Sequence, residues 1–327
     1  MQQLKAVVMV GALALAGCSE GLGPSAGSDL APSTPGVPAT PQTSAAVLAV
    51  LDQSGWSALD FGALGASSEF QNDGEPTGAS GAAGLASADV AVPEFWGRIR
   101  GEPVSKVRTV TEKGDTAWAS IKVDYNGAFL VDLTPGDNRL DVTSKPLVES
   151  LLQQARFEKT AIGERGEAHW ALVGITPQQY VATDESRRTV KITQVTVSVN
   201  GVVKIDVTDP TAFAKVVLGS EKTSHDVPAF NKGDTVRVVV KVANTTGTNN
   251  TPPTFAFLSS FHADPNGLGW RRMRMEDTGD GMFSLSWVVR QRGRERVIVA
   301  ALDAQSFVTP TADDYRANIW GIPYSIR

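Results

Sequence analysis

Apolar and polar residues alternate along much of the chain beyond residue 100, which is the pattern expected of β-strands with one buried face. The pattern is clearest over residues 116–125, where every second residue from Ala117 to Tyr125 is apolar. The pair Asn126-Gly127 comes next, and a further apolar run follows it at 128–133. Asn-Gly between two such runs is the strongest short signal of a β-hairpin. The pattern therefore predicts two strands joined by a tight turn at Asn126-Gly127.

Two other stretches have the features of helices. Residues 43–53 start with polar side chains, continue with good helix formers and are followed by Gly55, which predicts a short helix. From Pro146 onward the apolar residues fall at helical spacing, which predicts a second helix; they are Leu147, Val148, Leu151, Leu152 and Ala155. Residues 62–91, rich in Gly, Ala and Ser, are predicted to be a long loop or weak local structure.

Residues 43–182 are therefore predicted to form an α+β domain, with helices packed on a curved antiparallel sheet. An antiparallel strand pair is expected at 156–162 and 168–175. The Asn126-Gly127 hairpin and the segment 169–177 resemble the cystatin-like or nuclear-transport-factor-like cone fold. Members of that group often end with a Trp-containing strand that gives way to a Pro-bearing turn. The resemblance implies a cone-shaped domain that can hold a small ligand.

Trp118 and His169 are the candidate ligand-binding residues of this domain. Trp118 shares a strand face with polar residues, so it either lines the mouth of a cone-shaped pocket or lies beneath the first helix, and we favour the second interpretation. His169 alternates away from Trp170 on its strand. An exposed or half-buried structural histidine is the favoured interpretation of His169.

A polar segment at 183–188 is the predicted boundary to a C-terminal domain, 183–327, in which strands dominate. Strands are predicted at 190–199, 202–207, 235–243, 254–262, 270–275, 282–290 and 296–303, with an Asn200-Gly201 turn between the first two. Many short alternating strands with frequent turn residues indicate a β-sandwich. The segments 277–283 and 297–303 resemble the Asp/Gly-rich hairpin and the penultimate strand of bacterial immunoglobulin-like domains. The resemblance implies an immunoglobulin-like sandwich without the cysteine pair of antibody domains.

Composition narrows the class of protein. The chain has 327 residues, a net charge of −5 and a pI near 5.3. Binding to nucleic acid usually needs a basic face, so this charge argues against a nucleic-acid partner. The length suggests about two folded domains. Cys18 is the only cysteine, which excludes an intramolecular disulfide, thiol catalysis in the folded domains and a cysteine-based metal site.

The first residues have the features of an export signal. A short start containing Lys5 precedes an apolar stretch at 6–16, which is too short to span a bilayer as a helix. The sequence Leu-Ala-Gly-Cys at 15–18 resembles the lipobox of bacterial lipoproteins. That resemblance implies removal of residues 1–17 and attachment of acyl chains such as palmitate to Cys18. An ordinary secretory signal is the alternative.

The residues around this cysteine suggest where the protein is placed. Ser19, rather than an aspartate, follows Cys18, as in lipoproteins that are passed on to the outer membrane. Two or three acyl chains hold a protein stably to a membrane. Residues 18–42, rich in Pro, Ser, Gly and Ala, are predicted to be a disordered tether.

Candidate chemistry beyond the anchor is sparse. None of His169, His225 and His262 stands in a recognisable catalytic pattern, and the chain has no Gly-x-Ser-x-Gly nucleophile elbow. No catalytic residue or cofactor is therefore predicted, and the enzyme question stays open with a non-enzyme favoured. Asp277 and Asp280 are weak calcium candidates, for which a tight turn is the favoured interpretation.

Arginines gather in the C-terminal half. Arg272 and Arg274 are the candidate contacts for an anionic polysaccharide or a lipid head group, because a guanidinium pairs with anions in a fixed fork. A solvated strand face with scattered ion pairs is the favoured alternative.

Together these features predict an exported, lipid-anchored protein of the bacterial cell envelope, at the outer membrane, which acts as a non-enzymatic binding or adhesion module. Its expected partners are the membrane, through Cys18, and an envelope protein or glycan. The alternative is a small-ligand-binding or enzymatic cone domain, with the sandwich as a spacer.

Overall fold

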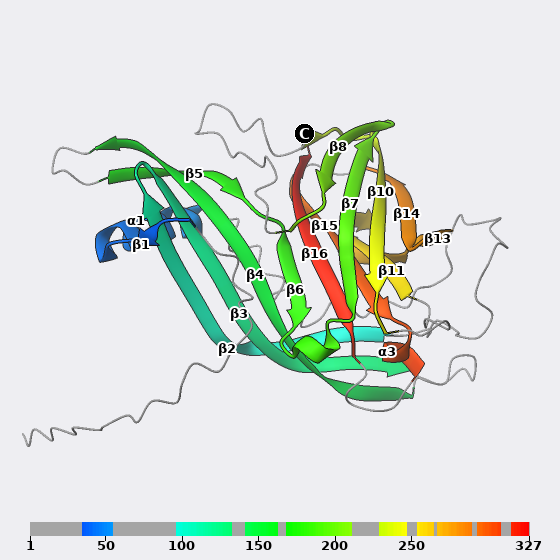
Figure 1. Cartoon of the computed structure of the whole chain (residues 1–327). Helices are drawn as coiled ribbons and strands as arrows, with labels where there is room; N and C mark the ends of the chain where they lie inside the picture. Colours follow the sequence, from blue (N-terminus) through cyan, green and yellow to red (C-terminus); the bar gives the residue numbers. More distant parts are fainter. Residues whose placement is uncertain are drawn as a thin grey trace, which may run out of the picture.

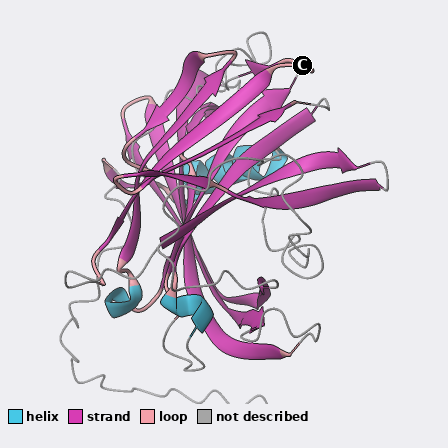
Figure 2. Ribbon diagram, turned by 90° about the vertical axis from the view of Figure 1, so that its right-hand side faces the viewer, coloured by secondary structure: helices cyan, strands magenta, loops and turns pink. Residues whose placement is uncertain are grey.

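The computed structural model describes residues 35–54, 96–132, 141–162, 168–210, 229–246, 254–264, 267–289, 293–308 and 315–326. Strands make up nearly all of this part of the chain, as Figure 2 shows. They form two sheets, one of eleven strands and one of five. The predicted signal, the residue Cys18 and the segment 62–91 lie outside the described residues.

The strands of the larger sheet are β1 (Val37–Pro38), β2 (Trp96–Lys113), β3 (Thr116–Asp132), β4 (Val142–Ile162), β5 (Ala168–Ile175), β6 (Gln178–Ala182), β9 (Ala229–Phe230), β11 (Thr254–Asp264), β12 (Gly267–Arg274), β15 (Gly293–Asp303) and β16 (Ala317–Ile326). They follow the order β1-β2-β3-β4-β6-β16-β15-β11-β12, with β5 paired to β4 and β9 paired to β16. The strands of the smaller sheet are β7 (Val190–Val199), β8 (Val202–Val207), β10 (Thr235–Asn244), β13 (Glu276–Gly279) and β14 (Met282–Val288). Their order is β13-β14-β10-β7-β8. The helical elements are α1 (Pro41–Gln53), the 3₁₀ turn η1 (Glu185–Arg187) and α3 (Gln305–Val308).

The larger sheet is strongly curved, so that its first long strand meets its last. In Figure 1, β2, β3 and β4 run from beside α1 and bend towards α3. At the far end of β2, the backbone oxygen of Trp96 accepts a hydrogen bond of 2.6 Å from Nη2 of Arg272 on β12. The guanidinium carbon of Arg272 also lies 3.5 Å from the centroid of the Trp96 ring. The curvature therefore encloses one face of the sheet, called the inner face below.

Three strands of the larger sheet bury side chains on both faces. Alternate residues of β11, β15 and β16 belong to two separate hydrophobic cores. Phe257, Ala300 and Ile319 lie in the first core, on the inner face. Leu258 and Val299 lie in the second core, between the two sheets. Burial on both faces explains why residues 297–302 of β15 are a continuous apolar run instead of an alternating one.

The smaller sheet covers the outer face of these strands. Its inward side chains, which include Val197, Val238 and Phe283, join the second core. Two sheets that face each other across one core have the layout of a β-sandwich, as predicted for this part of the chain. The turn between β7 and β8 is also confirmed, since Asn200 has φ 49° and Gly201 has φ 82°.

The predicted α+β domain, with its cone-like fold, is wrong, because the described part of the chain is nearly all β. The helix predicted at 43–53 is confirmed as α1, but one helix of 13 residues does not make a helical layer. The helix predicted from Pro146 lies instead within β4, a strand of 21 residues. Residues 149–155 of β4 are all buried, so both faces of the strand are covered and the expected alternation is lost. The apolar residues of the two faces, taken together, happen to fall at the spacing expected of a helix.

The predicted hairpin turn at Asn126-Gly127 is also wrong. Both residues lie inside β3, which runs unbroken from Thr116 to Asp132 and pairs with β4 along its whole length. A Cβ atom added at Gly127 would lie 2.0 Å from the backbone oxygen of Ile99 on β2. This glycine therefore serves the close approach of two backbones, next to a bulge in β2, and not a turn.

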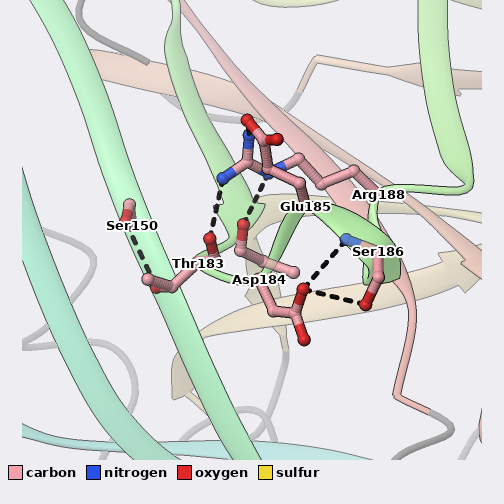
Figure 3. A network of polar contacts seen from close by, with 7 residues as sticks. Ser150, Thr183, Asp184, Glu185, Ser186 and Arg188 are labelled. Carbon is pink, nitrogen blue, oxygen red and sulfur yellow. Dashed lines mark hydrogen bonds and ion pairs between the residues drawn. The ribbon is translucent and has the colours of Figure 1, made fainter. Parts of the chain in front are cut away.

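Residues 183–188, the predicted domain boundary, form a compact connection between β6 and β7 (Figure 3). Asp184 caps η1, because its Oδ1 atom accepts hydrogen bonds from the backbone N–H and the hydroxyl of Ser186 at 2.9 and 2.8 Å. Arg188 donates from Nη2 to the backbone oxygen of Thr183 at 2.8 Å. The larger sheet continues across this point, since β6 pairs with both β4 and β16. A division into two domains here stays a prediction.

Candidate functional site

A cluster of charged side chains is buried on the inner face of the larger sheet. Arg98 and Arg100 alternate along β2 and are 3% and 7% exposed. Glu149 lies on β4 and is 2% exposed. Charged groups at this depth lose most of their hydration, so they persist only where the fold compensates them. This cluster is the strongest candidate for a functional site in the part of the chain that the structure describes.

The two arginines share the carboxylate of Glu149. Arg98 donates from Nη2 to Oε2, and Arg100 donates from Nε to Oε1 at 2.5 Å. The guanidinium carbon of Arg100 lies 4.1 Å from the centroid of the Tyr180 ring on β6, which adds a cation–π contact. Each carboxylate oxygen thus has its own guanidinium donor, and β2, β4 and β6 are held together through side chains.

The register of the strands explains how β2 reaches β4 across the intervening strand β3. Arg100 is paired with Gly127, and Gly127 in turn is paired with Leu147 of β4. The β3 residue beside Arg100 is thus a glycine, which has no side chain. Tyr125, the next inward residue of β3, lies opposite Glu149. The glycine that the sequence pattern assigned to a turn therefore lies beside the ion cluster, where its lack of a side chain lets the backbones of β2 and β3 approach.

The electrostatics of the cluster favour the ionised carboxylate. Burial by itself raises the pKa of Glu149, but the positive charges of Arg98 and Arg100 and their hydrogen bonds outweigh it. The pKa of Glu149 consequently lies below its ordinary value. A carboxylate held ionised between two guanidinium groups is poorly suited to donate or accept a proton near neutral pH.

Charge is balanced among the buried residues that the structure describes. The buried cations are Arg98, Arg100 and Lys145, and the buried carboxylates are Asp132, Glu149 and Asp303. Lys145 is fully buried and donates from Nζ to the backbone oxygen of Ser306 at 2.7 Å. The balance is not local, because Arg98, Arg100, Lys145 and Glu149 face the first core, whereas Asp303 lies on the opposite face of β15.

Aromatic rings fill the inner face beyond the cluster. The Trp96 ring centroid lies 4.8 Å from that of Phe257 and 5.7 Å from that of Phe307, both in edge-on geometry. Phe129 lies 4.8 Å from Tyr315 in the same group. All five side chains are buried. The ion cluster is thus one part of a packed interior.

A second buried carboxylate links the two sheets. Asp303, at the end of β15, is fully buried. Its Oδ2 atom accepts hydrogen bonds from Nδ2 of Asn244 at 3.1 Å and from Oγ1 of Thr246 at 2.5 Å. Its Oδ1 atom accepts from the backbone N–H of Gln305 at 2.9 Å. Because Asn244 ends β10, this contact ties the smaller sheet to the larger one.

The two candidate pocket residues do not come together. Ala117 and Ala119 are buried in the first core, so Trp118 points to the opposite face, away from α1, and is half-buried there. His169 is exposed. The register places Trp118 next to Arg156, which pairs with Gly174, five positions along β5 from His169. At about 3.3 Å per residue, the two sites are roughly 15 Å apart.

The candidate arginines contact aromatic rings of the protein itself. Arg272 joins β12 to Trp96, as described above. The guanidinium carbon of Arg274 lies 4.9 Å from the centroid of the Phe255 ring. Arg272 is half-buried and Arg274 is exposed. Arg272 thus bridges the place where the curved sheet closes, whereas Arg274 contacts a residue of the neighbouring strand β11. The role of both arginines towards an anionic ligand stays a prediction.

The calcium candidates form a tight turn. Oδ1 of Asp277 accepts a hydrogen bond of 2.9 Å from the backbone N–H of Gly279, and Asp280 has φ 54°. These are the features of an Asp/Gly turn. Among the described residues, no group of three or more His, Cys, Asp or Glu side chains could hold a metal ion. His225 and the side chain of His262 lie outside what the structure describes.

Sequence reasoning missed the ion cluster. Arg98 and Arg100 are separated by one apolar residue, a spacing that puts two charges on one face of a strand. That signal was available, but Glu149 lay in a segment assigned to a helix. With β4 in the wrong conformation, its partner could not be placed opposite β2.

Comparison with protein-family models and with curated proteins finds no match to this chain. Within the described part, no helix has both the length and the apolar character needed to cross a membrane.

Proposed function

We propose that this chain is an exported, lipid-anchored protein of the bacterial cell envelope that acts as a non-enzymatic binding or adhesion module. The observation that carries the proposal is the inner face around Arg98, Arg100 and Glu149, which is filled by paired charged groups and packed aromatic rings. An interior filled in this way leaves the surface as the place for a partner. The resemblance of residues 15–18 to a lipobox supports the anchor at Cys18.

The finer details of the proposal concern location and partners. Removal of residues 1–17 leaves Cys18 as the first residue, carrying acyl chains such as palmitate, and Ser19 directs the protein to the outer membrane. Residues 18–42 are the proposed tether between the anchor and the folded chain. Its last residues, 35–42, are part of the described structure and include β1 and the start of α1. The partner is an envelope protein or a glycan, and the C-terminal sandwich is of the immunoglobulin-like kind. Its Asp277–Gly281 turn between β13 and β14 and the apolar strand β15 support that likeness.

The alternative, a small-ligand-binding or enzymatic cone domain, depended on a fold that the chain does not adopt. Trp118 and His169 lie apart, and His169 is exposed. No contact in the described structure favours this alternative.

Two measurements test the proposal. Labelling with radioactive palmitate in the producing bacterium should mark the wild-type protein and leave a Cys18→Ser variant unlabelled. The secreted Cys18→Ser variant, which has no lipid of its own, should co-sediment saturably with isolated cell envelopes. Palmitate in both proteins or in neither would refute the anchor. Sedimentation no greater than that of an unrelated protein of similar charge would refute the binding module.

A further inference from the structure

The strand β2 has one open side along part of its length. The stretch 105–109, called the open edge below, pairs with β3 on one side without a register shift. On the other side the neighbouring strand is β1, which pairs with Thr111 and Glu112, beyond the open edge. The residues of the open edge are exposed or half-buried. Within the described part of the chain, no strand therefore covers this side of β2 at 105–109.

The backbone groups of Lys106 and Arg108 point away from β3 at the open edge. The N–H of Ala39, just after β1, donates to the backbone oxygen of Val110 at 3.0 Å, so the polar groups of Val110 point to the β1 side. Along a strand, every second residue directs its N–H and C=O groups to the same side. Those of Lys106 and Arg108 therefore point to the β1 side as well, where the described strands provide no partner. An edge of this kind is a template for pairing with a further strand.

The side chains of the open edge alternate between cations and an apolar group. Lys106 and Arg108 lie on the inner-face side of β2, since their partners on β3 belong to the first core. Val107 lies on the opposite side and is 49% exposed. Arg108 forms an ion pair of 2.9 Å with Asp52 of α1. Among the described residues, Lys106 has no carboxylate partner, so its positive charge is uncompensated.

This pattern of charge selects among the possible occupants of the edge. Two copies of the chain paired antiparallel about Val107 would place the Lys106 of each copy opposite the Arg108 of the other. Like charges directly opposite each other are destabilising, so a second copy is a poor occupant. A strand that carries carboxylates at these positions would instead form opposite-charge pairs across the new ladder.

We propose that the open edge of β2 is a docking site for an extended acidic segment of an envelope protein, which adds to the larger sheet as an antiparallel strand. Its backbone pairs with the outward N–H and C=O groups of Lys106 and Arg108. It places a carboxylate opposite Lys106 and an apolar side chain opposite Val107. The choice of an envelope protein rests on the proposed binding function, whereas the open edge and its preference for an acidic strand do not.

The openness of the edge is tested first, by amide hydrogen exchange on the intact protein, followed by NMR. The amides of Lys106 and Arg108 should have protection factors at least about 100-fold lower than that of Val107, because the amide of Val107 is bonded to β3. Equal protection of the three amides would show that the edge is covered and would overturn the proposal. Protection that rises with protein concentration would assign the edge to a second copy, which also overturns it.

The occupant is tested with the peptide acetyl-Thr-Glu-Val-Glu-Thr-amide. Saturating peptide should slow exchange at Lys106 and Arg108 by at least about 10-fold. A peptide with lysine in place of both glutamates should have no effect on wild type. The K106E variant should lose the response to the acidic peptide. The matched K204E variant changes an exposed lysine on the edge strand β8, where a bulge interrupts the pairing, and should respond as wild type does.

A peptide with methylated backbone nitrogens separates strand pairing from simple charge attraction. It cannot donate hydrogen bonds to the edge and should not bind. Equal binding of the methylated and unmethylated peptides would overturn the proposal, as would the absence of any response to the acidic peptide.

Co-sedimentation with isolated cell envelopes then tests the envelope partner. Adding K106E to the Cys18→Ser protein should weaken its binding to envelopes at least about 10-fold, because a like charge then faces the acidic segment. Unchanged binding would exclude the open edge as the partner's site. If the Cys18→Ser protein itself does not bind envelopes, the proposed function fails, while the exchange and peptide measurements still decide whether the edge accepts an acidic strand.

Discussion

Replacing Glu149 with glutamine tests whether the buried ion cluster is a structural element. The substitution keeps the shape of the side chain but removes the charge that Arg98 and Arg100 share. Both ion pairs involve side chains that are 3% exposed, so water cannot take over the role of the carboxylate. One of the two arginines would face an amide N–H₂, which is a donor, where it now faces an acceptor.

The expected loss follows from this burial. Removing one partner of a buried ion pair typically costs about 3–5 kcal/mol, because a charge is left uncompensated in the interior. We therefore expect E149Q to lower the free energy of unfolding by about 3–5 kcal/mol, measured by urea denaturation at neutral pH. Glu158 offers a matched control on the same strand, since its side chain is 49% exposed and pairs with Arg156 at 2.8 Å. E158Q should cost at most about 1 kcal/mol.

A third variant separates charge from packing. Replacing the whole cluster, in R98M/R100M/E149M, removes every buried charge at once and keeps apolar volume. Such replacements are often neutral or stabilising, so the triple variant should be more stable than E149Q. The reasoning would be refuted if E149Q and E158Q had the same small effect, or if the triple variant were less stable than E149Q.

Three further predictions concern neighbouring features. The pKa of Glu149 is lower in the folded than in the unfolded protein, so the ionised carboxylate stabilises the fold fully above the unfolded pKa and this effect is lost as pH falls through the folded pKa. In urea melts at a series of pH values, the stability difference between E149Q and wild type should therefore shrink in acid. A difference that stays constant with pH would contradict this. Gly127→Ala would put a Cβ atom 2.0 Å from the backbone oxygen of Ile99. Such overpacking should lower the free energy of unfolding by at least about 1–3 kcal/mol in the same urea denaturation assay. An unchanged urea midpoint would refute the close approach of the two backbones. Arg272→Lys keeps the charge but loses the planar contact with Trp96. It should therefore lower the free energy of unfolding by about 1–2 kcal/mol more than Arg274→Lys, which changes an exposed arginine on the same strand. Equal losses of stability in the two variants would argue against a structural role for Arg272.

Alternation predicted the strands of the smaller sheet well. The predicted ranges 190–199 and 202–207 agree with β7 and β8, and Asn200-Gly201 is the turn between them. These strands bury only one face, which in β7 includes Val195, Val197 and Val199. Apolar residues therefore recur at every second position of the sequence, which is the pattern that predicts a strand. Local pattern and tertiary environment agree there, and the prediction succeeds.

The same reasoning failed where the environment departs from that simple case. β4 is buried on both faces over 149–155, and its apolar residues lose the alternating period. Gly127 has a role that depends on the backbone of β2, which no local pattern can reveal. The Arg98–Glu149 pair joins residues 51 positions apart across an intervening strand. Such a pair can be found only after both strands have been placed in the right register.

The claim that function lies on the surface of a closed fold is tested most directly by one binding measurement. The R98M/R100M/E149M exchange would be added to the non-lipidated Cys18→Ser protein, and its co-sedimentation with isolated cell envelopes compared with that of Cys18→Ser alone. If the cluster is structural, the two proteins should bind with the same affinity, because the exchange leaves the surface unaltered. Loss of binding by a variant that still melts cooperatively would contradict the account and make the buried cluster part of the binding site.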